Sequence, residues 1–199
     1  IEDYEISFMI VFIVLVTLLI LYIVYENHTR NKELLKYAQT DALTGLYNKE
    51  TTEQLTDELL SEDENKYHAF LILDVDCFKQ INDIYGHAVG DIVLQKFGKL
   101  LKGTFREGDI LGRIGGDEFG VIMKNIQTKD IAMKKAEELL AKTQAYKIDE
   151  LKGNNISISI GISTAPQDGD CYMDLYKRAD QALYQAKRSG KARVCNYFS

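Results

Sequence analysis

Two pairs of carboxylates stand where the chain is expected to turn. Asp74 and Asp76 end a short apolar run, and Asp117 and Glu118 follow a Gly-Gly pair. Carboxylate oxygens are hard ligands of the kind that Mg²⁺ takes, and substrate phosphates and water commonly complete its shell. Glycines also let a ligand come close to the backbone. The spacing alone leaves two interpretations open, a metal–phosphate site or solvated carboxylates at the ends of strands.

The apolar patterns predict the elements that hold these carboxylates. Residues 69–75 are a continuous apolar run, which is typical of a buried strand, and residues 109–114 and 118–123 flank the Gly-Gly pair as a β-hairpin would. Residues 156–164 alternate as a strand does, and residues 192–198 are expected to form the last strand. Helices are predicted over residues 51–61, 90–101, 130–145 and 174–188. This order of elements predicts a mixed sheet flanked by helices.

The composition limits the classes of protein to consider. The chain has 199 residues, of which 46% are hydrophobic and 27% are charged, so it is long enough for one ordinary domain with a smaller attachment. Its net charge of −6 argues against nucleic acid as a partner. Cys77, Cys171 and Cys195 lack the spacing of a zinc site. We therefore expect three free thiols in a reducing compartment.

Residues 6–25 form an apolar run that only Ser7 and Thr17 interrupt. As a helix this run would be about 30 Å long, the thickness of the hydrocarbon layer. A buried core helix would need a polar face, and the acidic leading flank argues against a cleaved signal peptide. The sequence predicts a transmembrane helix over 6–25, preceded by an extracytoplasmic flank over 1–5.

The charges that follow the predicted span set its orientation. Arg30, Lys32 and Lys36 come after it, whereas no Lys or Arg precedes it. The positive-inside rule then places the C-terminal part of the chain in the cytoplasm. Residues 26–40 lack Gly and Pro and are expected to form a linker helix that carries a signal. Pairing of this helix as a coiled coil and a solvated linker both remain open.

Residues 113–119, Arg-Ile-Gly-Gly-Asp-Glu-Phe, resemble the signature of the GGDEF family, the diguanylate cyclases. Further motifs that resemble this family follow in the expected order. They are Asp41-Ala-Leu-Thr-Gly-Leu-Tyr-Asn48, the segment from Asp74 to Asp83, Gly86-His87 with Gly90-Asp91, and the late helix from Asp180 to Lys187. The resemblance identifies residues 41–199 as a GGDEF catalytic domain.

The resemblance implies both a fold and an activity. The fold is α+β, with a central mixed, mostly antiparallel sheet of about five strands flanked by helices, like that of nucleotidyl cyclases and polymerase palms. The activity is the condensation of two GTP molecules into cyclic di-GMP with release of pyrophosphate. Together with the predicted span and its basic flank, this activity predicts a location in the inner membrane of a bacterium, with a single span and the catalytic domain in the cytoplasm. An alternative is a non-catalytic receptor for GTP or cyclic di-GMP.

By position, the resemblance also implies site residues. Mg²⁺, for which Mn²⁺ can substitute, would be held by Asp74, the carbonyl of Val75, Asp117 and Glu118, and the last two are also catalytic. Asn82 and Asp91 would contact the guanine edge, which an amide and a carboxylate suit. The remaining substrate-binding residues are Phe78, Lys79, Gly115, Gly116, Lys187 and Lys191. For some of these a plain role stays open: core packing for Phe78 and a solvated charge for Lys79. His87 is interpreted as a residue that caps a helix or holds a loop, rather than as a base.

The implied chemistry also requires partners. Because each subunit holds one GTP and the product is two-fold symmetric, a homodimer is expected. Arg106-Glu-Gly-Asp109 resembles the RxxD element at which the family binds its own product, cyclic di-GMP, as an inhibitor. An Arg fork and a carboxylate suit a phosphate and a guanine edge. A simple ion pair between Arg106 and Asp109, or a solvated turn between helix and strand, is the alternative.

Overall fold

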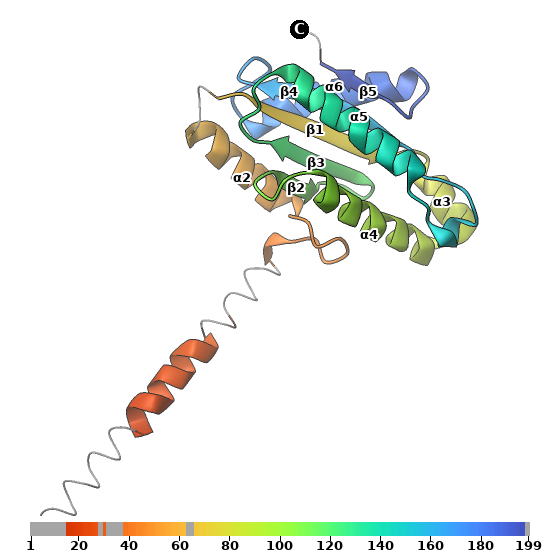
Figure 1. Ribbon diagram of the computed structural model, residues 1–199. Helices are drawn as coiled ribbons and strands as arrows, with labels where there is room; N and C mark the ends of the chain where they lie inside the picture. The colour runs from red at the N-terminus through yellow and green to blue at the C-terminus, as the bar shows by residue number, and fades with distance from the viewer. Residues whose placement is uncertain (1–14, 28–29, 31–37, 63–65, 198–199) are drawn as a thin grey trace, which may run out of the picture. The chain divides into compact units, whose positions relative to one another are not determined.

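A five-stranded sheet forms the centre of the larger of two units into which the chain divides, Ile1–Gln39 and Thr40–Ser199 (Figure 1). The computed structural model describes residues 15–27, 30, 38–62 and 66–197. The helices of the larger unit are α2 (Lys49–Glu62), α3 (Phe78–Tyr85), α4 (His87–Thr104), α5 (Lys129–Ala145) and α6 (Tyr172–Arg188), with a short 3-10 helix, η1 (Asp149–Leu151). The strands are β1 (His68–Val75), β2 (Ile110–Arg113), β3 (Glu118–Met123), β4 (Ile158–Ala165) and β5 (Val194–Asn196).

The strand order is β2-β3-β1-β4-β5, so β1 lies in the middle. β1 pairs antiparallel with β3 and β4, β2 pairs antiparallel with β3, and β5 runs parallel to β4. This arrangement confirms the predicted mixed, mostly antiparallel sheet. The register places Asp74 opposite Glu118 on one side and Ser159 on the other.

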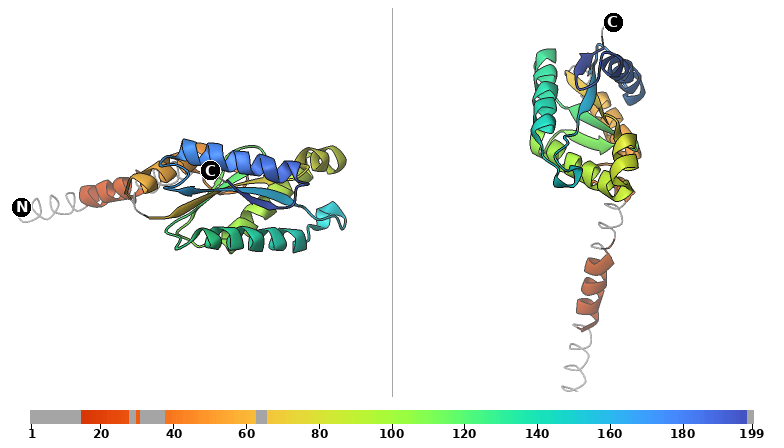
Figure 2. Two further views of the ribbon diagram at one scale, coloured as in Figure 1. Left: turned by 90° about the horizontal axis from the view of Figure 1, so that it is seen from above. Right: turned by 90° about the vertical axis from the view of Figure 1, so that its right-hand side faces the viewer.

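Alternation along β1 divides the core into two layers. Leu71 and Leu73 belong to the cluster that contains buried residues of α4 and α5, whereas Phe70 and Ile72 belong to the cluster that contains residues of α2 and α6. Figure 2 shows helices on both faces of the sheet. Burying each such side chain contributes about 1.5–3 kcal/mol. By the same alternation, Asp74 lies on the face of the sheet that α6 covers.

α6 packs unusually close to β4, and one glycine permits it. A Cβ at Gly161 would clash with the backbone of Ala179 and Leu183. Only a residue without a side chain fits between strand and helix here. The close approach brings the C-terminal part of α6, with Lys187, down to the end of β1.

The structure contains a helix, α3, that is not among the predicted elements. α3 follows β1 after two residues and is only eight residues long. Phe78, Ile81 and Tyr85 pack against the α4–α5 core from this helix. Two turns give too few repeats for a periodic pattern to stand out. His87 does not cap α4: Gly86 is the N-cap residue, and His87 is the exposed first residue of the helix.

Residues 15–27 of the smaller unit are helical. Within the described residues, no helix has both the length and the apolar character needed to cross a membrane. The predicted span over 6–25 lies partly outside the described residues, as do most of the predicted linker and the flank over 1–5.

Candidate functional site

The end of β1 brings together the carboxylates that the sequence singled out. Asp74 and Glu118 are opposite each other across β1 and β3, on the face covered by α6. Nζ of Lys187 lies 2.7 Å from Oδ2 of Asp74, whose side chain is only 10% exposed. The main-chain N–H of Val75 donates to the carbonyl of Asp117 at 3.2 Å, which holds the Gly-Gly turn against the end of β1.

Electrostatically, this group of carboxylates favours a cation. Burial, and then the neighbouring Asp117 and Asp76, raise the pKa of Asp74, although the ammonium of Lys187 opposes the shift. Burial, followed by the charge of Asp74, also raises the pKa of Glu118. Both shifts mean that ionised carboxylates are held close together in a poorly solvated place. Oxygen ligands of this kind fit Mg²⁺, which would relieve the repulsion.

A hydrogen-bonded turn carries the two glycines between β2 and β3. The N–H groups of Ile114 and Gly115 donate to the carbonyl of Glu118 at 3.0 and 3.2 Å. Arg113 donates from Nε and Nη2 to the carbonyl of Gly116 at 3.2 and 2.7 Å. Its Nη1 also contacts the carboxylate of Asp41, which lies near the start of the larger unit. Arg113 and Asp41 both belong to motifs that resemble the family, but the sequence predicted no role for either.

The predicted guanine-binding residues lie on α3 and α4. Asn82 is partly buried, and within the described part of the chain its Oδ1 has no hydrogen-bond partner. Gly90 lies so close that a Cβ at this position would clash with that oxygen. Asp91 is exposed at the next position of α4. A buried acceptor without a partner fits a ligand that donates hydrogen bonds, as a guanine edge does.

The predicted phosphate-binding lysines come from different elements. Lys187 borders a cleft of about 920 Å³ along the C-terminal half of α6. Nζ of Lys191, in the loop after α6, lies 3.1 Å from Sγ of Cys77, which immediately precedes α3. Lys79 is exposed in the first turn of α3. Phe78 is partly buried and packs against the core.

Arg106 and Asp109 form an ion pair in the turn between α4 and β2. Nε of Arg106 lies 2.9 Å from Oδ1 of Asp109, and Nη2 donates to the carbonyl of Lys124. The side chain of Asp109 is only 4% exposed, whereas that of Arg106 is 60% exposed. Both residues line a cleft of about 530 Å³ that Phe105, Ile126 and others complete. Arg106 and Asp109 therefore do form an ion pair, and this ion pair borders a cleft.

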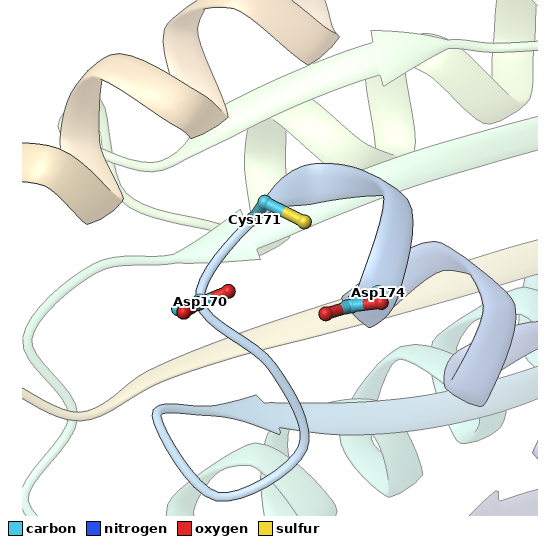
Figure 3. A group of neighbouring side chains, drawn as sticks. All are labelled: Asp170, Cys171 and Asp174. Atoms are coloured by element: carbon cyan, nitrogen blue, oxygen red, sulfur yellow. The ribbon is translucent and has the colours of Figure 1, made fainter.

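Another group of possible ligands lies at the opposite end of the sheet. Asp170, Cys171 and Asp174 cluster at the start of α6 (Figure 3). Ala165, the last residue of β4, pairs with His68, the first residue of β1, so this group is far along β1 from Asp74. Both carboxylates are exposed, and exposed acidic groups are common without an ion.

Residues 38–193 match the family described as "Diguanylate cyclase, GGDEF domain". The chain belongs to this family. Among curated proteins it is 37% identical to diguanylate cyclase A of Treponema denticola, over 82% of this chain and 46% of that protein. It is also 37% identical to the response regulator PleD of Caulobacter vibrioides, over 85% of this chain and 39% of that protein. The chain thus spans less than half the length of these two relatives.

Solved structures show the same likeness. The coiled coil and GGDEF domain of DgcB from Caulobacter crescentus, in complex with c-di-GMP, aligns with a TM-score of 0.80 and 25% identity. That alignment covers 87% of this chain and 93% of the other. The GGDEF domain of TpbB from Pseudomonas aeruginosa aligns with a TM-score of 0.75 and 33% identity, over 80% of this chain and 94% of the other. These likenesses confirm the predicted GGDEF fold.

Proposed function

We propose that this chain condenses two GTP molecules into cyclic di-GMP and pyrophosphate. The observation that carries the proposal is the pairing of Asp74 with Glu118 beside the Gly-Gly turn, with the ammonium of Lys187 2.7 Å from Asp74. Carboxylates, the ammonium group of Lys187 and the backbone of the two glycines lie together there, and binding of a nucleoside triphosphate requires groups of these kinds. Family membership, and relatives named as diguanylate cyclases, support the same activity.

In this proposal, separate groups of residues bind the guanine, the phosphates and the metal ion. Asn82 and Asp91 hold the guanine, and Lys187 and Lys191 contact phosphates. Asp74, Asp117 and Glu118, with the carbonyl of Val75, would hold Mg²⁺. When bound, the ion lowers the pKa of an attacking oxygen and neutralises charge on the leaving group. Lys187, which pairs with Asp74 in the structure, is then available to a phosphate.

The reaction itself needs two copies of the chain. The 3′-oxygen of one GTP loses its proton and attacks the α-phosphate of the other, and pyrophosphate leaves. Each chain supplies one GTP, so the two half-sites must face each other, and catalysis then consists mainly of positioning and electrostatics. A homodimer with two-fold symmetry is part of the proposal, because the product has this symmetry.

Two further parts of the proposal concern regulation and place. Cyclic di-GMP is expected to inhibit the enzyme by binding at Arg106 and Asp109, and the adjoining cleft of about 530 Å³ supports this site. The apolar run over residues 6–25 supports attachment to the inner membrane of a bacterium, with the catalytic domain in the cytoplasm.

One assay tests the activity. The purified chain, in detergent and with Mg²⁺, is incubated with GTP, and the nucleotides are separated by chromatography. Cyclic di-GMP and pyrophosphate in a 1:2 ratio are expected. Binding of GTP or cyclic di-GMP without turnover would favour the alternative, a receptor domain. An equal rate with ATP would contradict the assignment of Asn82 and Asp91 to guanine.

A further inference from the structure

Asp76 is a buried carboxylate two residues from Asp74, and the chain itself supplies hydrogen-bond donors to both of its oxygens. Only 6% of the residue is exposed. Its Oδ1 accepts a hydrogen bond from Oγ of Ser159 at 2.7 Å. Its Oδ2 accepts from Oγ of Ser157 at 2.9 Å and from the main-chain N–H of Ala192 at 3.1 Å. One side chain therefore joins the end of β1 to the start of β4 and to the loop that follows α6.

The loop that Asp76 holds has an unusual backbone. Gly190, Lys191 and Ala192 have φ angles of 111°, 60° and 48°. For residues with a side chain, each left-handed position costs about 1–2 kcal/mol. Such a conformation persists only where its surroundings hold it. The bond from Ala192 N–H to Asp76, and the bond from Lys191 N–H to the carbonyl of Ala186 at 3.1 Å, provide that support.

The held loop determines where the charge of Lys191 lies. The ammonium reaches across to Sγ of Cys77, at the start of α3, 3.1 Å away. Cys77 is the residue after Asp76, so the neighbouring loop residues Lys191 and Ala192 contact two neighbouring residues at the end of β1. Lys191 is exposed, and without a fixed loop its long side chain would sample many conformations.

We propose that Asp76 is a positioning residue for nucleotide binding: it fixes the left-handed turn 190–192 and thereby holds Lys191 at the start of α3 for the phosphates of GTP. This inference rests on the proposed function and deepens it. It also gives the two neighbouring aspartates different roles. Asp74 contacts the ammonium of Lys187, whereas Asp76 holds the loop that carries Lys191. From spacing alone, both had been candidates for a metal ion.

Two substitutions in the full chain distinguish positioning from metal binding. An amide at residue 76 can still accept from Ala192 N–H and can donate to the hydroxyl of Ser159. We expect Asp76→Ala to raise KM for GTP about tenfold with kcat nearly unchanged, and Asp76→Asn to restore KM to within about threefold. A metal ligand would instead tolerate the amide no better than alanine, and the Mg²⁺ concentration needed for half-maximal rate would rise. That pattern would overturn the inference.

A double-mutant cycle tests the link to Lys191. Once Lys191→Ala has removed the ammonium, adding Asp76→Ala should raise KM for GTP no further, because both act through one group. Additive effects would overturn the inference. Ser157→Ala is the matched control, because it removes one hydrogen bond of Asp76 without touching the bond to Ala192. KM for GTP should stay within about twofold of the wild type.

Hydrogen exchange gives a readout that does not depend on turnover. In the wild type and in Asp76→Asn the amide of Ala192 should be protected, whereas in Asp76→Ala its exchange should accelerate about tenfold or more. Unchanged protection in Asp76→Ala would overturn the inference. An inactive wild type with the expected exchange pattern would instead refute the proposed function and leave the role of Asp76 in the turn standing. If Asp76→Ala fails to fold, Asp76→Asn is measured alone. A KM for GTP within about threefold of the wild type then supports the role of residue 76 as a hydrogen-bond acceptor, and a raised Mg²⁺ requirement shows a metal ligand.

Discussion

Arg113 joins the Gly-Gly turn to Asp41, a residue near the start of the larger unit. Its Nη1 lies 3.1 and 3.3 Å from the two oxygens of Asp41. Its Nε and Nη2 donate to the carbonyl of Gly116. Both side chains are largely buried, at 16% and 23% exposure. One guanidinium group thus binds Gly116 and Asp41 at the same time. This fixes the position of the Gly-Gly turn relative to the segment that contains Asp41.

We expect Arg113→Ala to lower kcat about tenfold or more, because the turn that carries Asp117 and Glu118 would lose its anchor. Arg113→Lys should recover little, since an ammonium cannot hold both partners. Steady-state kinetics on the full chain measure this, and Lys99→Ala, an exposed change on α4, is the control. Turnover at the wild-type rate in Arg113→Ala would show that the anchor has no part in catalysis.

Asp41 gives the stability of the fold a dependence on acid pH. Burial alone would raise the pKa of Asp41, but hydrogen bonds from Thr44 and the charge of Arg113 lower it below its ordinary value of 3.8. A lowered pKa means stabilisation that is complete above the unfolded-state pKa and is lost as the pH falls through the folded-state pKa. Asp41→Asn should therefore cost about 1–3 kcal/mol at pH 7 and progressively less below about pH 4. Urea unfolding between pH 3 and 7 measures the difference, and an equal gap at every pH would contradict the prediction.

Glu118 is expected to lower the stability of the fold, although the proposed cyclase activity requires it. Its pKa is raised, first by burial and then by Asp74, so its ionised form opposes folding. For a carboxylate with a raised pKa, stability is greatest below the unfolded-state pKa and falls as the pH rises through the folded-state pKa. At pH 7.5, Glu118→Gln should thus raise the melting temperature by a few degrees while removing cyclase activity.

The matched control for Glu118→Gln is Asp174→Asn, because Asp174 is an exposed carboxylate far along the sheet. It should leave both activity and melting temperature unchanged. Addition of Mg²⁺ with GTP should stabilise the wild type more than Glu118→Gln. A melting temperature that falls in Glu118→Gln would show that the carboxylate stabilises the empty fold, contrary to its raised pKa.

Gly90→Ala should weaken GTP binding through Asn82. The added methyl group would displace Oδ1 of Asn82, which is buried and, within the described residues, has no hydrogen-bond partner. KM for GTP is expected to rise about tenfold, with preference for GTP over ATP reduced. Gly103→Ala, on the same helix with open space around the new Cβ, is the control and should leave KM unchanged. An unchanged KM in Gly90→Ala would mean that Asn82 does not contact the base.

The sequence predicted the sheet well because its strands bear strong local patterns. The apolar run of β1 and the Gly-Gly pair of the β2–β3 hairpin specify elements whose pairing then brings Asp74 opposite Glu118. α3 was not predicted because eight residues carry little periodicity.

The relationships that join distant segments could not be predicted in the same way. The bond from Asp76 to Ala192 spans the chain from β1 to the loop after α6, and its acceptor is one of two aspartates that look alike in sequence. The pairing of Lys187 with Asp74 depends on the close packing at Gly161, which no local pattern signals. For Arg113, a usable signal did exist: an arginine two residues before a Gly-Gly pair, with an acidic residue opening the domain.

The last prediction concerns inhibition by the product. Asp109 accepts hydrogen bonds from the main-chain N–H of Arg106 and of Lys124, at 3.3 and 3.1 Å, and is nearly buried, so it serves chiefly to orient the arginine. The guanidinium of Arg106 is the exposed partner and borders the cleft that Phe105 and Ile126 help to line. A guanidinium fork of this kind suits a phosphate or the Hoogsteen edge of guanine. We therefore expect Arg106→Ala to relieve inhibition by cyclic di-GMP about tenfold or more while sparing the initial rate.

Rates measured with added cyclic di-GMP at several GTP concentrations test this expectation. Binding at a separate site should lower the maximal rate without being overcome by GTP, because the two ligands act through the arrangement of the half-sites. Glu107→Ala, an exposed change in the same turn, is the control and should keep full inhibition. If Arg106 and Asp109 form only a structural ion pair, Arg106→Ala will lower the melting temperature and leave inhibition as in the wild type. Inhibition that disappears at high GTP would instead place the product in the active site.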